Sequence, residues 1–290
     1  MDTLYRWSKF VSDDRLDEWE HRLLAEEVPY VLEKHVKRQR WSLSVYTPTE
    51  EEAELLRARF GGSVGPLVPD AWMPGRAVVE SPPLRIRDAL VVTASDDPDT
   101  LAQLAGENPG RAILSFPHQL AFGTGGHPTT ANCLRFVADF AKRQGDRPWH
   151  MLDLGCGSGI LAIAAAKLGA ASVLAVDNDG MALEYARQNG GRHGVEDIVE
   201  FSEGDAVALM AAAPARRYDL LAANLFSDLL EELFPRFPAH LAPGGELVIS
   251  GFLESQAPAI SRCADTAGLP LLRTTRRGKW MAARAIRENA

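Results

Sequence analysis

The chain is poor in cysteine, with only Cys133, Cys156 and Cys263 among its 290 residues. These cysteines are too few and too widely spaced for a disulfide framework or a cysteine-rich zinc site, so no metal is expected. The longest strongly apolar stretch, residues 160–168, includes a lysine and is far shorter than the ~20 residues that span a bilayer. The first residues also lack the basic and then apolar pattern of a signal peptide. We therefore expect a soluble, cytoplasmic protein with no membrane partner.

Basic residues are outnumbered by acidic ones: the chain has 31 Lys and Arg residues and 39 Asp and Glu residues, which gives a net charge of −8. An acidic chain has no general affinity for nucleic acid, so no direct nucleic-acid binding is expected, whereas a basic protein partner is compatible with this charge. Solvated surfaces are the favoured interpretation of the two basic clusters in the sequence. These clusters are Lys34, Lys37, Arg38 and Arg40, and Arg273, Arg276, Arg277 and Lys279.

The length indicates two domains. Residues 1–70 are expected to form a small α/β domain of ferredoxin-like β-α-β-β-α-β order. Within it, Thr49 and Glu52 form a capping box that opens a helix, and Gly61 ends that helix. Residues 62–83 are rich in Gly and Pro and read as a connector rather than packed structure, with residues 71–83 as the linker between the domains.

Residues 84–290 are expected to form the second domain. Strand-like and helix-like segments alternate regularly after residue 150, which predicts a doubly wound, Rossmann-like, mostly parallel sheet. The expected strands are 84–93, 151–154, 172–176, 198–202, 218–223 and 246–250, with two closing strands around Leu271 and Ala283. The expected helices are 160–168, 181–189, 228–237 and 254–267, and residues 96–99 are expected to form a turn or loop.

Three glycines follow the strand at 151–154, in the motif Asp153-Leu154-Gly155-Cys156-Gly157-Ser158-Gly159. Glycine lets the backbone turn tightly and approach a ligand without a Cβ in the way. The helix that follows offers unpaired N–H groups at its first turn. A dinucleotide site prefers the spacing G-x-G-x-x-G, so this G-x-G-x-G spacing favours a ligand without a pyrophosphate. A tight turn that binds nothing is the alternative.

Three polar residues end the strands that follow, where the ligand crevice of such a sheet lies. Asp177, 22 residues after Gly155, is placed to accept both hydroxyls of a ribose, and Asp179 is expected in the next turn or helix cap. Asp205 is either an acceptor for the amine of adenine or a residue of a loop or helix cap. Asn224 could hold a cofactor group or orient an attacking amine, or it could be an ordinary residue at the end of a strand.

A loop at residues 121–130 contains three glycines, a phenylalanine and three threonines before a helical run. Such a loop is flexible and polar enough to close over a small ligand. Thr129 or Thr130 is expected to cap the helix. His127 lacks a second histidine at ligand spacing, so structural hydrogen bonding is favoured over metal binding or catalysis.

Together these motifs resemble a known family. Residues 84–290 resemble class I S-adenosylmethionine-dependent methyltransferases. The combination of F-G-T-G-x-H-P-T-T, D-L-G-C-G-S-G-I-L-A, A-V-D and A-N-L is similar to that of the ribosomal protein L11 methyltransferase family (PrmA). The resemblance implies that Thr130, Gly155, Asp177 and Asn224 bind S-adenosylmethionine. The wider superfamily pattern adds Gly157 and Asp205.

The resemblance also implies a reaction and a substrate. Methyl groups would pass to lysine ε-amines of a large-subunit ribosomal protein of the L11 type, with its N-terminal amine as a further candidate. The small first domain would recognise this basic substrate, and a monomer is expected because no exposed apolar stripe is evident. Asn224 would orient the amine without a dedicated strong base.

Three alternatives stay open from the residues alone. The first is a methyltransferase of the same fold that acts on another protein lysine or a small amine. The second is a nicotinamide-dependent oxidoreductase, against which the missing G-x-G-x-x-G spacing argues. The third is a binding module that keeps the fold without turnover, against which the intact glycines, Asp177 and Asn224 argue.

Overall fold

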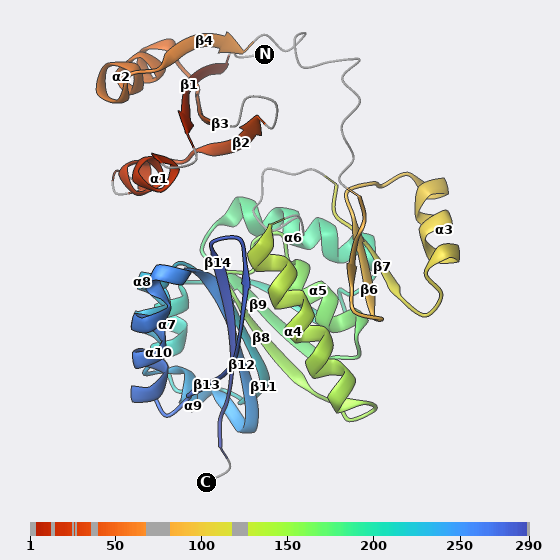
Figure 1. Ribbon diagram of the computed structural model, residues 1–290. Coiled ribbons are helices and arrows are strands. Elements are labelled where there is room, and N and C mark those ends of the chain that lie inside the picture. The colour runs from red at the N-terminus through yellow and green to blue at the C-terminus, as the bar shows by residue number, and fades with distance from the viewer. Residues whose placement is uncertain are drawn as a thin grey trace. The chain divides into compact units, whose positions relative to one another are not determined.

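The chain folds as two compact units, Met1–Val79 and Glu80–Ala290 (Figure 1). The computed structural model describes residues 4–12, 15–24, 26, 28–35, 40–67, 82–117 and 127–288. The expected linker, residues 71–83, therefore lies almost wholly outside the described residues. Each unit is described by itself below.

The first unit has a four-stranded sheet in the order β2-β3-β1-β4, with antiparallel neighbours throughout. Its elements are β1 (Leu4–Ser12), α1 (Leu16–Leu24), β2 (Val31–His35), β3 (Arg40–Thr47), α2 (Glu50–Phe60) and β4 (Ser63–Leu67). This is the strand order of a ferredoxin-like fold. A connector is expected from residue 62 onward, and this expectation is wrong for β4. This segment forms a strand despite Gly65 and Pro66, because Leu4–Ser8 of β1 offers it an edge for hydrogen bonding.

Alternation along β1 and β3 gives the sheet of the first unit two different faces. One face packs Trp7, Leu43 and Val45 into a core with aromatic residues of the two helices. Thr49 caps α2 by accepting the N–H of Glu52, and Gly61 ends it, as predicted. The opposite face carries Arg6, Phe10, Ser44 and Tyr46, with Arg6 directly opposite Tyr46 in the register.

The second unit is built on a seven-stranded sheet in the order β10-β9-β8-β11-β12-β14-β13. Its first five strands are parallel, and β14 and β13 are antiparallel additions. The strands are β8 (His150–Leu154), β9 (Ser172–Asp177), β10 (Val199–Glu203), β11 (Tyr218–Asn224), β12 (Leu241–Leu253), β13 (Leu271–Arg277) and β14 (Trp280–Ile286). The predicted doubly wound, mostly parallel sheet is confirmed.

Helices cover both faces of this sheet (Figure 1), and each face has its own buried core. One face is covered by α4 (Pro128–Gln144), α5 (Ile160–Lys167) and α6 (Gly180–His193). The other is covered by α7 (Ala206–Ala211), α8 (Ser227–Leu233), α9 (Phe237–His240) and α10 (Ala257–Thr266), with a 3-10 turn at Glu254–Gln256. The single helix expected over 228–237 is wrong, because the chain turns between α8 and α9, and Pro238 lies in the first turn of the second helix.

A small three-stranded sheet precedes α4. It contains β5 (Leu84–Ile86), β6 (Leu90–Thr93) and β7 (Ala112–Ser115), with α3 (Pro98–Glu107) between the last two. The single strand expected over 84–93 is therefore wrong, since Arg87 turns the chain with φ 53° and β5 pairs antiparallel with β6. The turn expected at 96–99 is instead the start of α3, where Asp97 accepts the N–H of Thr100.

Candidate functional site

The glycine motif forms a tight turn between β8 and α5. Gly155, Gly157 and Gly159 all have positive φ, at 66°, 53° and 78°. A Cβ at Gly155 would collide with Cδ2 of Leu225, and one at Gly159 would lie 2.9 Å from Cε1 of Phe201. Both the backbone conformation and the surrounding contacts therefore require glycine here.

Asp177, at the end of β9, is joined to this turn by hydrogen bonds. Its Oδ2 accepts the backbone N–H of Gly157 at 2.7 Å, and its Oδ1 accepts the N–H of Asp179 at 3.0 Å. Each carboxylate oxygen keeps a second lone pair, so the group can still accept hydroxyls. Asp179 caps α6 by accepting the N–H of Met181, which confirms its predicted place in a helix cap.

Asp205 lies at the neighbouring strand end and caps α7. Its Oδ1 accepts the N–H of Ala208 at 2.7 Å, and the side chain is exposed. The helix-cap interpretation is thus confirmed. The alternative role, as an acceptor for an adenine amine, stays a prediction that depends on the second oxygen.

Three buried oxygen acceptors lie behind the glycine turn, and we call Thr130, Asp153 and Asn224 the buried polar cluster. Thr130 and Asp153 are each only 1% exposed. Oγ1 of Thr130, both carboxyl oxygens of Asp153 and Oδ1 of Asn224 are buried without a hydrogen-bond partner among the residues that the structure describes. Buried polar atoms normally have hydrogen-bond partners. Several buried oxygens without such partners in one place therefore indicate a binding site for a polar ligand.

The strand register explains how the cluster forms. Asp153 of β8 pairs with Ala222 of β11, so Asp153 and Asn224 face the same side of the sheet. Helix α4 packs on that side and contributes Thr130 and Cys133. Burial raises the pKa of the Cys133 thiol, and the charge of Asp153 raises it further, while a hydrogen bond with Ser250 of β12 opposes this. Helix α4 packs against β11 and β12.

The cluster is electrostatically prepared for a cation. Burial raises the pKa of Asp153 to about 8, the backbone N–H of Ala162 opposes this rise, and the nearby charge of Asp177 adds to it. A cationic or N–H-bearing group would ionise this carboxyl and satisfy the unpaired oxygens around it. Sequence reasoning used Asp153 only as part of the glycine motif and missed it as a site residue, although its place two residues before Gly155 was the available signal.

His127 caps α4, which corrects the expectation that Thr129 or Thr130 does so. Nδ1 of His127 lies 2.7 Å from Oγ1 of Thr129 and accepts the Thr129 N–H at 3.4 Å, and Pro128 occupies the first helical position. The ring also meets Trp280 edge-on at 5.1 Å. Burial, with a smaller effect of the Lys279 charge, lowers the pKa of His127 to about 4. The predicted structural hydrogen bonding by His127 is confirmed. Residues 122–126 of the same motif lie outside the described residues.

Two large apolar side chains are exposed close to this edge of the sheet. Phe226, two residues after Asn224, is 62% exposed, and Met181, four residues after Asp177, is 59% exposed. Leu225, between Asn224 and Phe226, packs across Gly155. The rim of the site therefore combines apolar contacts with the polar cluster below it.

A separate cavity of about 590 Å³ lies at the opposite, amino-terminal edge of the sheet. Its lining includes Ser172, Val199 and Tyr218, which begin or nearly begin their strands, together with Arg216. Ligands of open parallel sheets bind at the carboxyl ends of the strands, so this cavity is not part of the site.

Comparison with known proteins gives a consistent result. The family described as ribosomal protein L11 methyltransferase (PrmA) matches residues 77–288. A protein of Brucella suis named ribosomal protein L11 methyltransferase is 34% identical over 251 residues, which cover 84% of each chain. One of the same name from Allorhizobium ampelinum is 32% identical over 261 residues, with the same coverage. The crystal structure of a ribosomal protein L11 methylase from Lactobacillus delbrueckii subsp. bulgaricus has a TM-score of 0.56 and 27% identity, and covers 71% of this chain and 99% of that one.

Proposed function

The chain belongs to the ribosomal protein L11 methyltransferase family, and from this premise we propose that it transfers methyl groups from S-adenosylmethionine to amines of ribosomal protein L11. The acceptors are lysine ε-amines, with the N-terminal amine of the substrate as a further acceptor. The observation that carries this proposal is the buried polar cluster beside the glycine turn, because oxygens without a partner among the described residues match a ligand that is cationic and bears N–H groups.

The residues present fit S-adenosylmethionine. Asp177 would hold the ribose hydroxyls, Gly155 and Gly157 would admit the cofactor close to the backbone, and Asp205 would accept from the adenine amine. The buried polar cluster would hold the methionine part, whose ammonium matches the acceptors of Thr130 and Asp153. When bound, the cofactor supplies an activated methyl group on a sulfonium.

The protein's own task is to present a neutral amine in line with that methyl group. A free lysine has a pKa near ~10.4, so it must lose a proton first, and desolvation beside a positive charge favours this loss. Oδ1 of Asn224 would accept one amine N–H and so direct the lone pair. His127 is a poor proton acceptor because its pKa is about 4, which agrees with a mechanism without a dedicated strong base.

We assign substrate recognition to the first unit. On the face of its sheet opposite the helices, Phe10 is 48% exposed and Tyr46 is 39% exposed. Arg6, directly opposite Tyr46 in the register, donates to Oγ of Ser44 at 3.0 Å. Aromatic and arginine side chains are the residue types that dominate binding energy at protein interfaces. The enzyme is proposed to act as a monomer in the cytoplasm, and no helix among the described residues is long and apolar enough to cross a membrane.

A methyltransferase of the same fold that acts on a different amine is the second candidate. One observation favours keeping it: the family match begins at residue 77 and so leaves all but the last three residues of the first unit outside it. The substrate-selecting residues proposed above are therefore not part of that match.

The deciding experiment is intact-mass spectrometry of ribosomal proteins from a strain that lacks their methylation, after incubation with this protein and S-adenosylmethionine. Mass increments of whole methyl groups on ribosomal protein L11 alone are expected. Increments on another protein would show that the reaction is as proposed but that the substrate is a different protein. Absence of transfer to any protein, with normal binding of S-adenosylhomocysteine, would contradict a catalytic role. The same incubation without S-adenosylmethionine serves as the negative control.

A further inference from the structure

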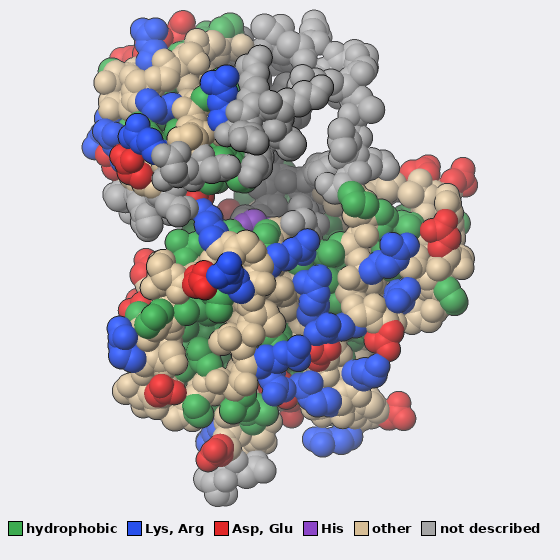
Figure 2. Space-filling view, viewed as in Figure 1, with side chains coloured by type: hydrophobic (Ala, Val, Ile, Leu, Met, Phe, Trp, Pro, Cys, Tyr) green, Lys and Arg blue, Asp and Glu red, His purple; other side chains and the backbone are tan. Residues whose placement is uncertain are grey.

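Cations gather on one side of the second unit, around α4. We call this set the α4 basic face; it consists of Arg87, Arg135, Lys142, Arg143, Arg273, Arg277 and Arg284. Figure 2 shows a run of blue side chains over α4 and its neighbours. The concentration stands out because the whole chain has a net charge of −8.

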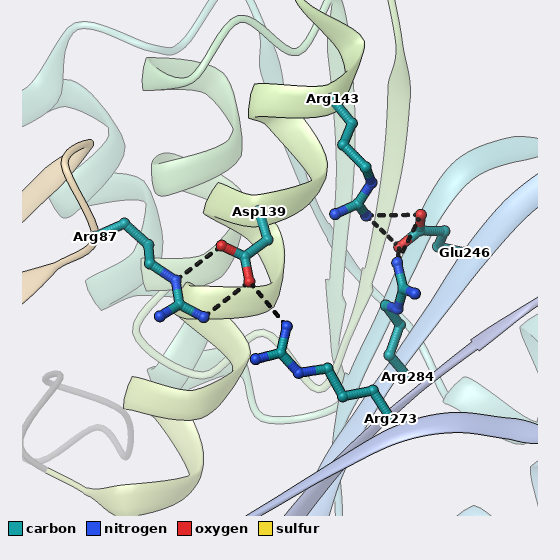
Figure 3. A network of polar contacts seen from close by, with 6 residues as sticks. All are labelled: Arg87, Asp139, Arg143, Glu246, Arg273 and Arg284. Atoms are coloured by element: carbon teal, nitrogen blue, oxygen red, sulfur yellow. Dashed lines mark hydrogen bonds and ion pairs between the residues drawn. The ribbon is translucent and has the colours of Figure 1, made fainter.

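Ion pairs hold the arginines of this face in place but leave it positive (Figure 3). Asp139 of α4 binds Arg87 through two contacts of 2.8 Å and also lies 3.6 Å from Arg273. Glu246 of β12 is likewise shared, by Arg143 at 2.7 Å and Arg284 at 3.2 Å.

The remaining cations are less well neutralised. Lys142 pairs with Asp88 at 2.7 Å. Among the described residues, Arg135 donates to neutral oxygens, those of Ala131 and the Asn132 side chain. Arg277 has no ion pair with any residue that the structure describes. Among the described residues, three carboxylates thus pair with cations of this seven-membered face, and Arg135 and Arg277 are the two without an ion pair.

Three features of this face work against stability. Arg273 lies directly opposite Arg284 in the β13–β14 register, and like charges in that position are destabilising. Arg87 has a left-handed backbone, with φ 53°, where glycine or asparagine would be less strained. The pKa of Arg135 is lowered by burial first and by the charges of Arg277 and Arg87 next. The shared carboxylates offset part of this repulsion, and a bound anion would offset more of it.

We propose that the α4 basic face binds the phosphate backbone of structured RNA. The guanidinium group is planar, always charged and matches phosphate oxygens with two parallel hydrogen bonds. Shared carboxylates hold four of the arginines in fixed positions, so little side-chain entropy is lost on binding. The overall acidic charge led us to expect no nucleic-acid contact, but a local patch decides binding at the ~8–10 Å range over which charges act in physiological salt.

The choice of RNA among polyanions rests on the proposed function, because ribosomal proteins are assembled on RNA. The face also begins close to the site. Arg277 pairs with Trp280 at the β13–β14 turn, and the Trp280 ring contacts His127 at the start of α4. From there α4 runs for 17 residues, or about 25 Å. RNA bound along this face would therefore lie next to the amine that is methylated, so that an RNA-bound form of the substrate is also accepted.

Binding is tested by fluorescence anisotropy with the full chain and a labelled RNA duplex of about 16 base pairs, over a range of salt concentrations. The test variant is Arg135→Gln with Arg277→Gln, which removes the two cations of the face that have no ion pair with a described residue. The matched control is Arg217→Gln with Arg262→Gln, because both arginines are exposed, lie outside the face and change the net charge equally. Circular dichroism and methyl transfer to free ribosomal protein L11 verify that each variant is folded and active.

Wild-type affinity is expected to fall steeply with salt. The test variant is expected to bind at least about tenfold more weakly at low salt, with a log–log salt slope reduced by about 2, while the control stays within about twofold. Undetectable RNA binding by the wild type, or equal loss in both variants, would overturn the proposal. Competition by anionic phospholipid vesicles or polyglutamate as strong as that by RNA would overturn the choice of RNA. Methyl transfer is read separately, so failure of the proposed function would be visible by itself.

Discussion

The carboxylate of Asp177 accepts the backbone N–H of Gly157 at 2.7 Å, which ties the end of β9 to the glycine turn after β8. The two elements meet only in the folded sheet, 20 residues apart in sequence. This bond holds the carboxylate and the turn at a fixed distance before any ligand arrives. The proposed ribose acceptor and the proposed backbone cradle are therefore positioned together, and substitution of Asp177 affects both.

We predict that Asp177→Asn weakens binding of S-adenosylhomocysteine by about 10- to 100-fold. A hydrogen bond to a charged acceptor contributes roughly 1.5–3 kcal/mol, and the amide has one acceptor oxygen where the carboxylate has two. Isothermal titration calorimetry measures the loss. Asp179→Asn is the matched control, because asparagine caps a helix as well as aspartate does and affinity should stay unchanged. Equal losses in the two variants would refute the specific role of Asp177.

Asn224→Ala is predicted to separate stability from activity. Oδ1 of Asn224 is buried without a described partner, so its removal should leave the free energy of unfolding unchanged or raise it by up to about 1 kcal/mol. The turnover number should fall by about 100-fold, because the attacking amine loses its alignment. Thermal unfolding and a methyl-transfer assay measure the two effects, with the exposed Asp228→Asn as control. A destabilised variant with normal turnover would show that Asn224 is only structural.

The parts of the site that could be predicted from sequence are those with local signals. Glycines at 155, 157 and 159 followed by an apolar helix indicated the turn, and one acidic residue at the next strand end indicated Asp177. Both signals are local, because the residue types in a short segment determine its backbone conformation. The strand and helix alternation after residue 150 was predictable for the same reason.

Other parts depend on contacts between distant segments. Thr129 and Thr130 are good capping residues, yet His127 caps α4, because Pro128 suits the first helical position and places His127 before it. β4 exists because β1 offers it an edge, although its own residues include glycine and proline. The α4 basic face joins residues near positions 87, 140 and 280, which no local pattern brings together.

Asp153 leads to a prediction about protons. Its pKa of about 8 in the folded protein means that the carboxyl is mainly protonated at neutral pH. A cationic ligand favours the ionised form, so binding of S-adenosylmethionine should release up to about one proton, and affinity should rise with pH until about pH 8. Calorimetric titration in buffers of different ionisation enthalpy counts the released protons. Asp153→Asn should abolish the release, and a wild-type protein that releases none would place Asp153 outside the cofactor site.

Gly155→Ala is predicted to destabilise the protein by more than backbone strain explains. A left-handed alanine costs roughly 1–2 kcal/mol, and the new Cβ would also collide with Leu225. Gly194→Ala is the matched control, since Gly194 has φ 58° and open space around it, so that only the strain applies. Chemical denaturation of both variants gives the difference. Equal destabilisation would mean that Leu225 moves aside without cost.

His127 provides a test that distinguishes capping from catalysis. Because asparagine is a good helix cap, His127→Asn should keep turnover and stability at pH 7, whereas His127→Ala should cost about 1 kcal/mol. The pKa of His127 is lowered from 6.5 to about 4, so below pH 6.5 the unfolded chain binds a proton that the folded protein does not. Wild-type stability should therefore decline from pH 6.5 towards pH 4, and His127→Asn should lack this part of the decline. Denaturation curves across this range, with turnover measured in parallel, decide the matter: if His127→Asn folds normally but loses turnover, the ring takes part in the reaction.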